Sequence, residues 1–153
     1  MDPSIALASE YSGKADAYLR LWSPVIAPMA RPLVDRLPLA AARWILDVGT
    51  GTGALLEELG AAAAGSARIL AVDRALGMLR VAQRRTQHPI VAMDAELLAI
   101  RSGTIDAATL VFMLFHVSDP VAAPVVSEVL PRVTQPRART ASAGGWRRFP
   151  RKR

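Results

Sequence analysis

From residue 43 to about residue 130, short apolar runs alternate with longer amphipathic runs. The apolar runs cover residues 43–48, 67–73, 89–94 and part of 104–117. The amphipathic runs cover residues 54–65, 75–86 and about 119–130. Short, continuously apolar runs are typical of strands buried on both faces, and the amphipathic runs are typical of helices. The alternation predicts an α/β fold in which crossover helices join the strands of a parallel sheet.

The residues before this region predict helices. Residues 5–21 place Ile5, Tyr11, Ala15, Tyr18 and Leu21 roughly on one helical face. The next segment contains Pro24, Pro28, Pro32 and Pro38, so we expect only a short or kinked helix there, over about 29–37.

The positive charge is concentrated at one end of the chain. The net charge is +6, but residues 131–153 contain eight Lys and Arg and no acid, whereas residues 1–130 have a small acidic excess. Because residues 131–153 show no apolar periodicity, we predict that this segment is disordered. Such a tail could contact nucleic acid or an anionic membrane. We favour another interpretation, in which it is the remnant of a truncated or frame-disrupted gene.

Composition excludes several classes of protein. The 153 residues suffice for one domain with a core, and 52% of them are hydrophobic. The sequence contains no apolar run long enough to span a bilayer, no secretory signal pattern and no cysteine. We therefore expect a cytoplasmic protein. His, Asp and Glu are not clustered at metal-ligand spacing, so we predict no metal site.

Three glycines at alternate positions, Gly49, Gly51 and Gly53, separate a predicted strand from a predicted helix in WILDVGTGTGALLEEL. Glycines at such a turn let the backbone approach a ligand, and the following helix presents free N–H groups. The spacing therefore predicts a binding turn. It leaves two kinds of cofactor open, because Gly49-x-Gly51-x-x-Ala54 also fits the dinucleotide fingerprint.

Three aspartates end predicted strands. Asp47 precedes the glycines, where it would repel a pyrophosphate but attract the ammonium of a zwitterionic amino-acid moiety. Asp73 ends the second strand, at a position where an acid accepts hydrogen bonds from ribose hydroxyls. Asp94 ends the third strand. All three therefore lie at the carboxyl edge of the sheet, where ligands bind in open α/β folds.

Four segments resemble, in order and spacing, the class I S-adenosylmethionine-dependent methyltransferases of the ubiquinone and menaquinone biosynthesis type. They are ILDVGTGTGALLEEL, AVDRALGMLRVAQRR, VAMDAE and IDAATLVFMLFHVSDP. The resemblance implies a Rossmann-like parallel sheet with helices on both faces. It also implies methyl transfer from S-adenosylmethionine to a small organic acceptor. The alternatives are an NAD(P)-binding Rossmann protein and a non-catalytic S-adenosylmethionine-binding fold.

The same resemblance implies residue roles. The implied cofactor-binding residues are Asp47, Gly49, Thr50, Gly51, Gly53, Asp73, Arg74, Asp94, Ala95 and Phe112. His116 follows the fourth strand, beside the implied methyl-transfer site. It is the candidate catalytic residue, and the alternative is a wall residue with one backbone hydrogen bond. Tyr11, Tyr18 and Trp22 resemble the helical cap that closes over substrate.

The resemblance divides the chain into a helical cap (1–42), a cofactor-binding domain (43–130) and a basic tail (131–153). Family members continue into three further strands, whereas EVLPRV here begins the likeness and then leaves it. The predicted sheet is therefore incomplete at its C-terminal end. The fourth strand would then be an apolar edge, AATLVFMLF, which favours pairing with a second copy, and a homodimer is possible on this ground.

Overall fold

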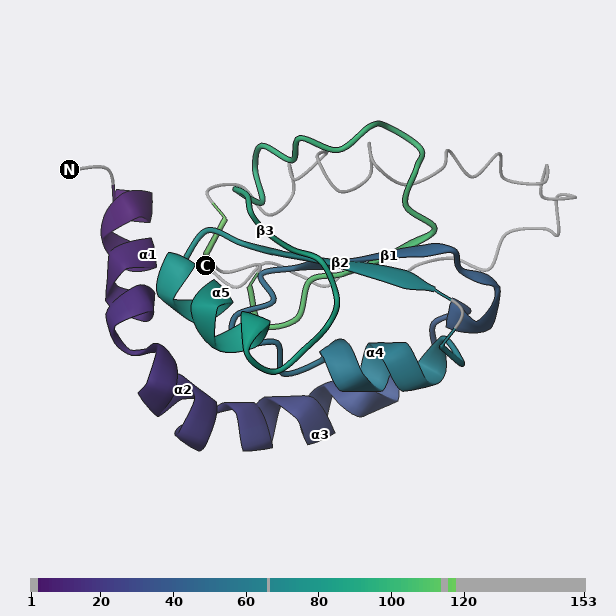
Figure 1. Ribbon diagram of the computed structural model, residues 1–153, viewed down its shortest axis with the longest axis horizontal. Helices are drawn as coiled ribbons and strands as arrows, with labels where there is room; N and C mark the ends of the chain where they lie inside the picture. The colour runs from purple at the N-terminus through teal and green to yellow at the C-terminus, as the bar shows by residue number, and fades with distance from the viewer. Residues whose placement is uncertain (1–2, 66, 114–115, 118–153) are drawn as a thin grey trace, which may run out of the picture.

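The computed structural model describes residues 3–65, 67–113 and 116–117 (Figure 1). The elements in chain order are α1 (Pro3–Gly13), α2 (Ala15–Leu21), α3 (Ser23–Val34), the 3-10 turn η1 (Leu39–Ala41), β1 (Trp44–Val48), α4 (Leu56–Ala62), β2 (Arg68–Asp73), α5 (Leu76–Gln83), β3 (Ile90–Ala92) and β4 (Ala107–Thr109). The four strands form one parallel sheet in the spatial order β3-β2-β1-β4. The predicted parallel α/β sheet is confirmed.

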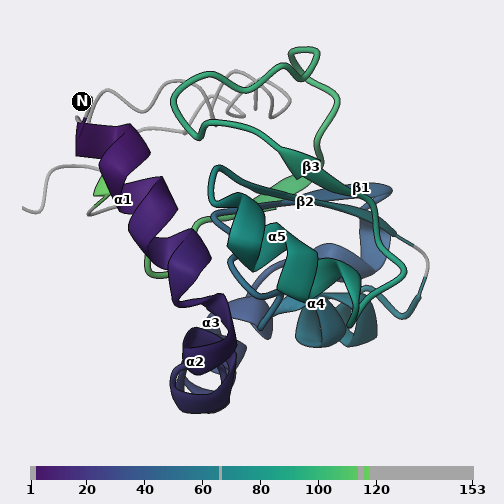
Figure 2. The ribbon, with the colours of Figure 1, turned by 60° about the vertical axis from the view of Figure 1, so that its left-hand side comes forward.

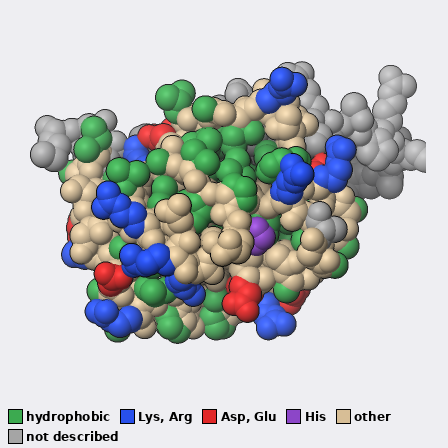
Figure 3. Space-filling model, viewed as in Figure 1, with side chains coloured by type: hydrophobic (Ala, Val, Ile, Leu, Met, Phe, Trp, Pro, Cys, Tyr) green, Lys and Arg blue, Asp and Glu red, His purple; other side chains and the backbone are tan. Residues whose placement is uncertain are grey.

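Helices α3, α4 and α5 lie together on one side of the sheet (Figures 1 and 2). The alternating side chains of the strands explain this layer, because Ile45 of β1 and Ile69 of β2 face the helices and are fully buried. On the face seen in Figure 3, acidic and basic side chains surround an apolar area. This mixture of signs agrees with a positive excess that resides in residues 131–153.

The opposite side of the sheet is covered by an irregular segment. Leu46, Val48 and Val72 project to this side and pack with Ile105 and with the residues between β3 and β4. The helix predicted over about 119–130 lies outside the described residues, as does the tail. Among the described residues, helices therefore cover one face of the sheet only.

The N-terminal prediction of one helix over 5–21 is wrong in one respect. The structure has two helices, α1 and α2, separated at Lys14, which follows Gly13 and has a non-helical φ of −108° and ψ of 8°. Helix α1 crosses α5 closely, since a Cβ at Gly77 would lie 2.2 Å from the carbonyl oxygen of Ser12. The break at Lys14 lets α1 and α2 pack on α5 from different directions.

The short helix predicted over about 29–37 is also wrong, because α3 runs over Ser23–Val34 with two prolines inside it. Pro24 lies in the first turn, where a missing N–H is harmless. Pro24, Pro28 and Pro32 are four residues apart and all exposed, so the carbonyl groups they leave unpaired fall on the side of the helix that faces water. Burial of Ala30 and Val34 on the other side stabilises the helix.

Other elements are shorter than predicted. β3 and β4 have three residues each, and the chain leaves β4 after Thr109 because it turns to line the central cavity. Leu76 is 54% exposed at the first turn of α5. The buried residues of this helix are Met78, Leu79, Val81 and Ala82, because α5 is packed between the sheet and the N-terminal helices.

Candidate functional site

The turn between β1 and α4 has the backbone conformation that its glycines suggest. Gly49, Gly51 and Gly53 have φ values of 72°, 56° and 77°, in the left-handed region that a Cβ disfavours. The N–H groups of Gly49 and Thr50 donate to the carbonyl oxygen of Val72, at 2.8 and 3.0 Å. The glycine turn is thus fastened to β2, the neighbouring strand.

The glycines of this turn have different surroundings. A Cβ at Gly49 would lie 2.8 Å from Cβ of Met113, and one at Gly53 would lie 3.1 Å from a methyl group of Leu56. A Cβ at Gly51 would meet no atom within 4 Å, and Gly51 lines the central cavity. Gly51 therefore presents bare backbone to open space, which is what close approach of a ligand requires.

The central cavity has a volume of about 670 Å³ and lies at the carboxyl ends of β1, β2 and β3. This size suits a cofactor or another small molecule. Its walls come from the N-terminal helices, the glycine turn, the ends of β2 and β3, and residues 111–113 and 116–117. The position agrees with the general location of ligands in open parallel sheets.

Asp73 ends β2 and faces this cavity. Its Oδ2 accepts a hydrogen bond from the N–H of Gly51 at 2.8 Å, and its Oδ1 accepts one from the N–H of Ala75 at 2.8 Å. Burial raises the pKa of Asp73, and these backbone donors oppose the rise. The hydrogen bond to Gly51 joins the acid directly to the glycine turn.

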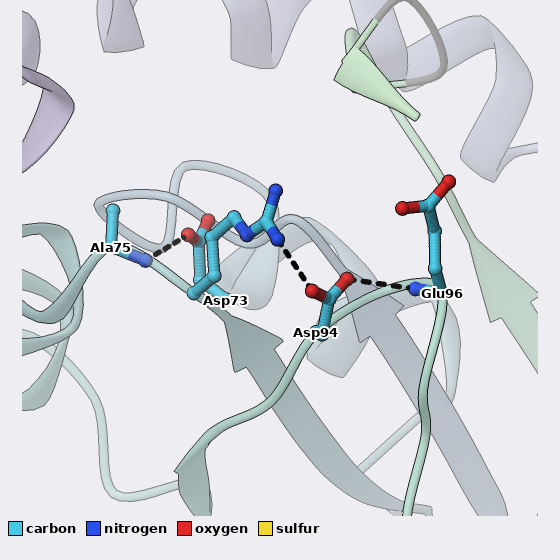
Figure 4. Close-up of polar contacts among 5 residues, drawn as sticks. Asp73, Ala75, Asp94 and Glu96 are labelled. Atoms are coloured by element: carbon cyan, nitrogen blue, oxygen red, sulfur yellow. Dashed lines mark hydrogen bonds and ion pairs between the residues drawn. The ribbon is translucent and has the colours of Figure 1, made fainter. Parts of the chain in front are cut away.

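Asp94 also lines the cavity, and Figure 4 shows it near Asp73. Its Oδ2 accepts a hydrogen bond from a guanidinium N–H of Arg74 at 2.5 Å, and its Oδ1 accepts one from the N–H of Glu96 at 2.9 Å. Arg74 directly follows Asp73 in the chain. The ends of β2 and β3 are therefore bridged by an ion pair on the cavity wall.

Asp47 lies in β1, beside the cavity but not on its wall. Its side chain is buried, and the hydroxyl of Thr109 donates to Oδ1 at 2.7 Å. Burial raises the pKa of Asp47 to about 6, against the effect of this hydrogen bond. The predicted contact between Asp47 and a ligand ammonium group stays a prediction.

Two tyrosines of the N-terminal helices pack together, and one of them contacts His116 in the segment after β4. The hydroxyl of Tyr11 lies 3.1 Å from Nε2 of His116, and the two rings are edge to face with centroids 5.3 Å apart. Tyr18 packs edge to face on Tyr11 at 6.0 Å. Burial raises the pKa of the Tyr18 hydroxyl. All three rings line the cavity.

Phe112 has a φ of 55°, which is unusual for a residue with a bulky side chain. It is 44% exposed and lines the cavity. Such a conformation costs on the order of 1 kcal/mol or more and persists where the surroundings impose it. The turn at Phe112 brings Met113 under Gly49 and places His116 beside Tyr11.

The structure brings most of the predicted site residues together. Those on the cavity wall are Gly49, Gly51, Asp73, Arg74, Asp94, Ala95, Phe112 and His116. Asp47, Thr50 and Gly53 lie behind this wall. Their assignment as ligand contacts remains a prediction.

Sequence reasoning missed the residues that support the glycine turn from behind. Thr52 is fully buried, and its hydroxyl forms a hydrogen bond of 2.7 Å with the hydroxyl of Ser23 at the start of α3. A guanidinium N–H of Arg85 donates to the carbonyl oxygen of Thr52 at 2.9 Å. In the sequence, the only indication of these contacts is that Thr52, between Gly51 and Gly53, carries a hydroxyl group.

Two negative findings concern the described part of the chain. No three of its His, Asp and Glu side chains are grouped so that they could hold a metal ion. None of the helices in those residues is long and apolar enough to cross a membrane.

Comparison with protein families gives one match to a family profile. Residues 45–137 match the family described as "Methyltransferase domain". The matched residues contain β1 except its first residue, β2 to β4, the glycine turn and the three aspartates. More than half of the chain is therefore covered.

Curated proteins of similar sequence include ubiquinone biosynthesis O-methyltransferases and demethylmenaquinone methyltransferases. The chain is 34% identical over 101 residues to a ubiquinone biosynthesis O-methyltransferase of Chromobacterium violaceum, covering 62% of this chain and 42% of that protein. It is 36% identical over 107 residues to a demethylmenaquinone methyltransferase of Renibacterium salmoninarum, covering 69% and 43%. The chain thus spans less than half the length of these relatives.

Among solved structures, the phosphoethanolamine N-methyltransferase 1 of Haemonchus contortus, in complex with phosphoethanolamine and S-adenosylhomocysteine, has a similar fold. The TM-score is 0.65 at 19% identity, covering 85% of this chain and 30% of that one. At this identity the likeness concerns the fold alone. It supports the Rossmann-like assignment.

Proposed function

The chain belongs to the class I S-adenosylmethionine-dependent methyltransferases, and from this premise we propose that it methylates a small organic acceptor held under its N-terminal helices. One observation carries the proposal. The glycine turn and the acids at the ends of β2 and β3 converge on one cavity of about 670 Å³. That cavity also reaches the Tyr11–His116 pair.

The residues present fit S-adenosylmethionine. Bare backbone at Gly51 provides the cradle that a Cβ would fill, and Asp73 beside it can accept hydrogen bonds from ribose hydroxyls. Asp94 and Ala95 would contact the adenine, and Phe112 would close the methyl-transfer end. Asp47, Thr50 and Gly53 would bind the cofactor indirectly, by holding the turn in place from the side away from the cavity. When bound, the cofactor supplies a methyl group on a sulfonium, ready for direct displacement by the acceptor.

The charges on the cavity wall favour this ligand over a dinucleotide. Four acids, Glu10, Asp73, Asp94 and Glu96, face two bases, Lys14 and Arg74. This acidic excess opposes a pyrophosphate and attracts a ligand with an ammonium and a sulfonium. The alternative function, NAD(P) binding, is therefore disfavoured.

We place the acceptor against the N-terminal helices. Leu21, Trp22, Val25 and Met29 contribute an apolar wall there. Such a wall suits an aromatic or otherwise apolar acceptor, in keeping with the quinone-related names of the relatives.

Tyr11 and His116 would handle the proton of an acceptor hydroxyl. The Tyr11 oxygen can accept that proton while its own proton passes to Nε2 of His116, 3.1 Å away. Alignment of acceptor and methyl group supplies most of the remaining rate enhancement. His116 is the proposed general base.

We also propose that the chain divides into a helical cap (1–42), a cofactor-binding domain (43–130) and a basic tail (131–153). We further propose a cytoplasmic location and a homodimer through the β4 edge. Contact between residues 131–153 and nucleic acid is an additional, less favoured proposal.

Calorimetry with the full chain tests the cofactor. We expect S-adenosylmethionine and S-adenosylhomocysteine to bind, and NAD⁺ and NADH not to bind. Binding of NADH without binding of the sulfur nucleosides would replace the proposal with the dehydrogenase-like alternative. Binding of the sulfur nucleosides without methylation of any hydroxylated aromatic acceptor would support a non-catalytic binding fold.

A further inference from the structure

Arg74 links the two acids at the adenosine end of the proposed site, Asp73 and Asp94, which Figure 4 labels. Its backbone follows Asp73 at the end of β2, and its guanidinium reaches Asp94 beyond the end of β3. All three side chains lie on the cavity wall. Arg74 therefore connects the proposed ribose-binding acid to the proposed adenine-binding acid.

The carboxylate of Asp94 is held at both oxygens. Arg74 donates to Oδ2 and the N–H of Glu96 donates to Oδ1. A carboxylate has about four acceptor positions, so about two remain for a ligand. The two contacts fix the plane of the carboxylate and leave it able to accept a donor from the cavity.

The backbone next to Asp94 is tied to β2 by a hydrogen bond from the N–H of Met93 to the carbonyl oxygen of Asp73, at 3.1 Å. β3 is an edge strand among the described strands and ends at Ala92, and Asp94 has one isolated bridge, to Leu97. The regular strand pairing of the sheet therefore ends before Asp94. The Arg74 contact is the one described link between the Asp94 side chain and β2, a strand paired on both sides.

Stability accounts for only a small part of the role of this ion pair. The Arg74 and Asp94 side chains are 27% and 35% exposed, and partly exposed ion pairs contribute only modestly to folding. A fixed carboxylate on a cavity wall has a clearer use in recognition, where misplacement of a hydrogen-bonding group by about 1 Å is costly.

We propose that Arg74 is a specificity-determining positioning residue, which holds Asp94 so that its carboxylate accepts a hydrogen bond from the exocyclic amino group of the ligand's purine. This inference rests on the proposed function and deepens it. A purine with an oxo group at that position presents an acceptor to Asp94 and is rejected. Arg74 acts through Asp94, without itself touching the reacting atoms.

The test compares two ligands that differ at this one group, S-adenosylhomocysteine and S-inosylhomocysteine, by calorimetry with the full chain. The wild type should prefer the adenosine compound by about tenfold or more, the worth of one hydrogen bond to a charged group. Arg74→Ala should reduce this preference to about twofold or less, mainly through weaker binding of the adenosine compound. Arg74→Lys, which keeps a charge but not the planar fork, should be intermediate.

Two control variants separate this role from a general one. Arg80→Ala removes an exposed arginine of α5 and should change neither affinity. Asp73→Asn should weaken both ligands by a similar factor and keep their ratio, because it acts at the ribose. Circular dichroism verifies that each variant is folded. If Arg74→Ala does not fold, the change in ligand preference is measured with Arg74→Lys.

Each alternative outcome is distinct. If the wild type binds neither compound, the proposed function fails and this inference with it. If the wild type binds both and discriminates, but the arginine variants keep the wild-type ratio, Arg74 is only structural and the inference is overturned. Tighter binding of both compounds to Arg74→Ala would overturn it in another way, because Arg74 would then be an obstacle in the site.

Discussion

The hydroxyl of Tyr11 and Nε2 of His116 are 3.1 Å apart although 105 positions separate them in the sequence. The contact joins α1 to the segment that follows β4. It is the point at which the N-terminal helices meet the proposed methyl-transfer end of the cavity.

Replacement of Tyr11 by Phe should separate chemistry from cofactor binding. Phe keeps the edge-to-face ring contacts and removes only the hydroxyl. If the pair carries the acceptor's proton, kcat should fall by about 100-fold, at the lower end of general acid–base contributions. Formation of S-adenosylhomocysteine with a dihydroxylated aromatic acceptor measures the rate. Affinity for S-adenosylhomocysteine should be unchanged, and an unchanged kcat would assign the hydroxyl to packing alone.

Substitution at Gly51 should abolish cofactor binding. Gly51→Val places a branched side chain at a φ of 56° and fills open space on the cavity wall. We expect no heat of binding with S-adenosylhomocysteine. Gly13→Ala is the matched control, since a Cβ there also meets nothing within 4 Å but lies outside the cavity wall. Binding by Gly51→Val with near-normal affinity would contradict the assignment of this turn.

Asp47 should make the fold less stable as the pH rises. Its pKa is raised from 3.8 to about 6 in the folded protein, so the stabilisation is complete below about pH 4 and is lost as pH rises through 6. The size of this loss is on the order of 3 kcal/mol. Asp47→Asn, which can still accept the Thr109 hydrogen bond, should remove this part of the pH dependence. Urea unfolding from pH 4.5 to pH 8 should show about 2 kcal/mol of this loss, because part of it occurs below pH 4.5. Identical pH profiles for the two proteins would refute the prediction.

Two glycine-to-alanine changes inside helices should have opposite effects. Gly77→Ala puts a Cβ 2.2 Å from the carbonyl oxygen of Ser12, so α1 must move away from α5. We expect a loss of about 1–3 kcal/mol in the free energy of unfolding, as for other overpacked contacts. Gly60→Ala in α4 meets its nearest atom at 3.6 Å and should stabilise by about 0.5–1 kcal/mol. Chemical denaturation compares them, and faster hydrogen exchange in α1 should accompany only Gly77→Ala.

The sequence predicted the part of the fold that depends on local pattern. β1 and the turn after it could be predicted because an apolar run and the positive-φ glycines leave few alternatives. The same pattern placed Asp73 and Asp94 on one edge, and both line the cavity. Family resemblance, carried by the same residues, predicted the methyltransferase family correctly.

Features that depend on tertiary contacts could not be predicted in this way. The prolines of α3 suggested a short helix, and only burial of Ala30 and Val34 explains its full length. The turn at Phe112 ends β4 early, against a strongly strand-like sequence. The hydrogen bond between Ser23 and Thr52 joins residues with no sequence signal in common.

The carbonyl oxygen of Val72 accepts the N–H groups of both Gly49 and Thr50, and Gly51 is bound to Asp73, so the turn and β2 form one unit. A ligand meets these groups already in place, and little ordering entropy is lost there when it binds. Because the turn does not open, the cofactor has to enter and leave on the side of the N-terminal helices. We expect the residence time of the cofactor to depend on how often α1 and α2 move away from α5. Gly77→Ala, which weakens that contact, should therefore shorten the residence time.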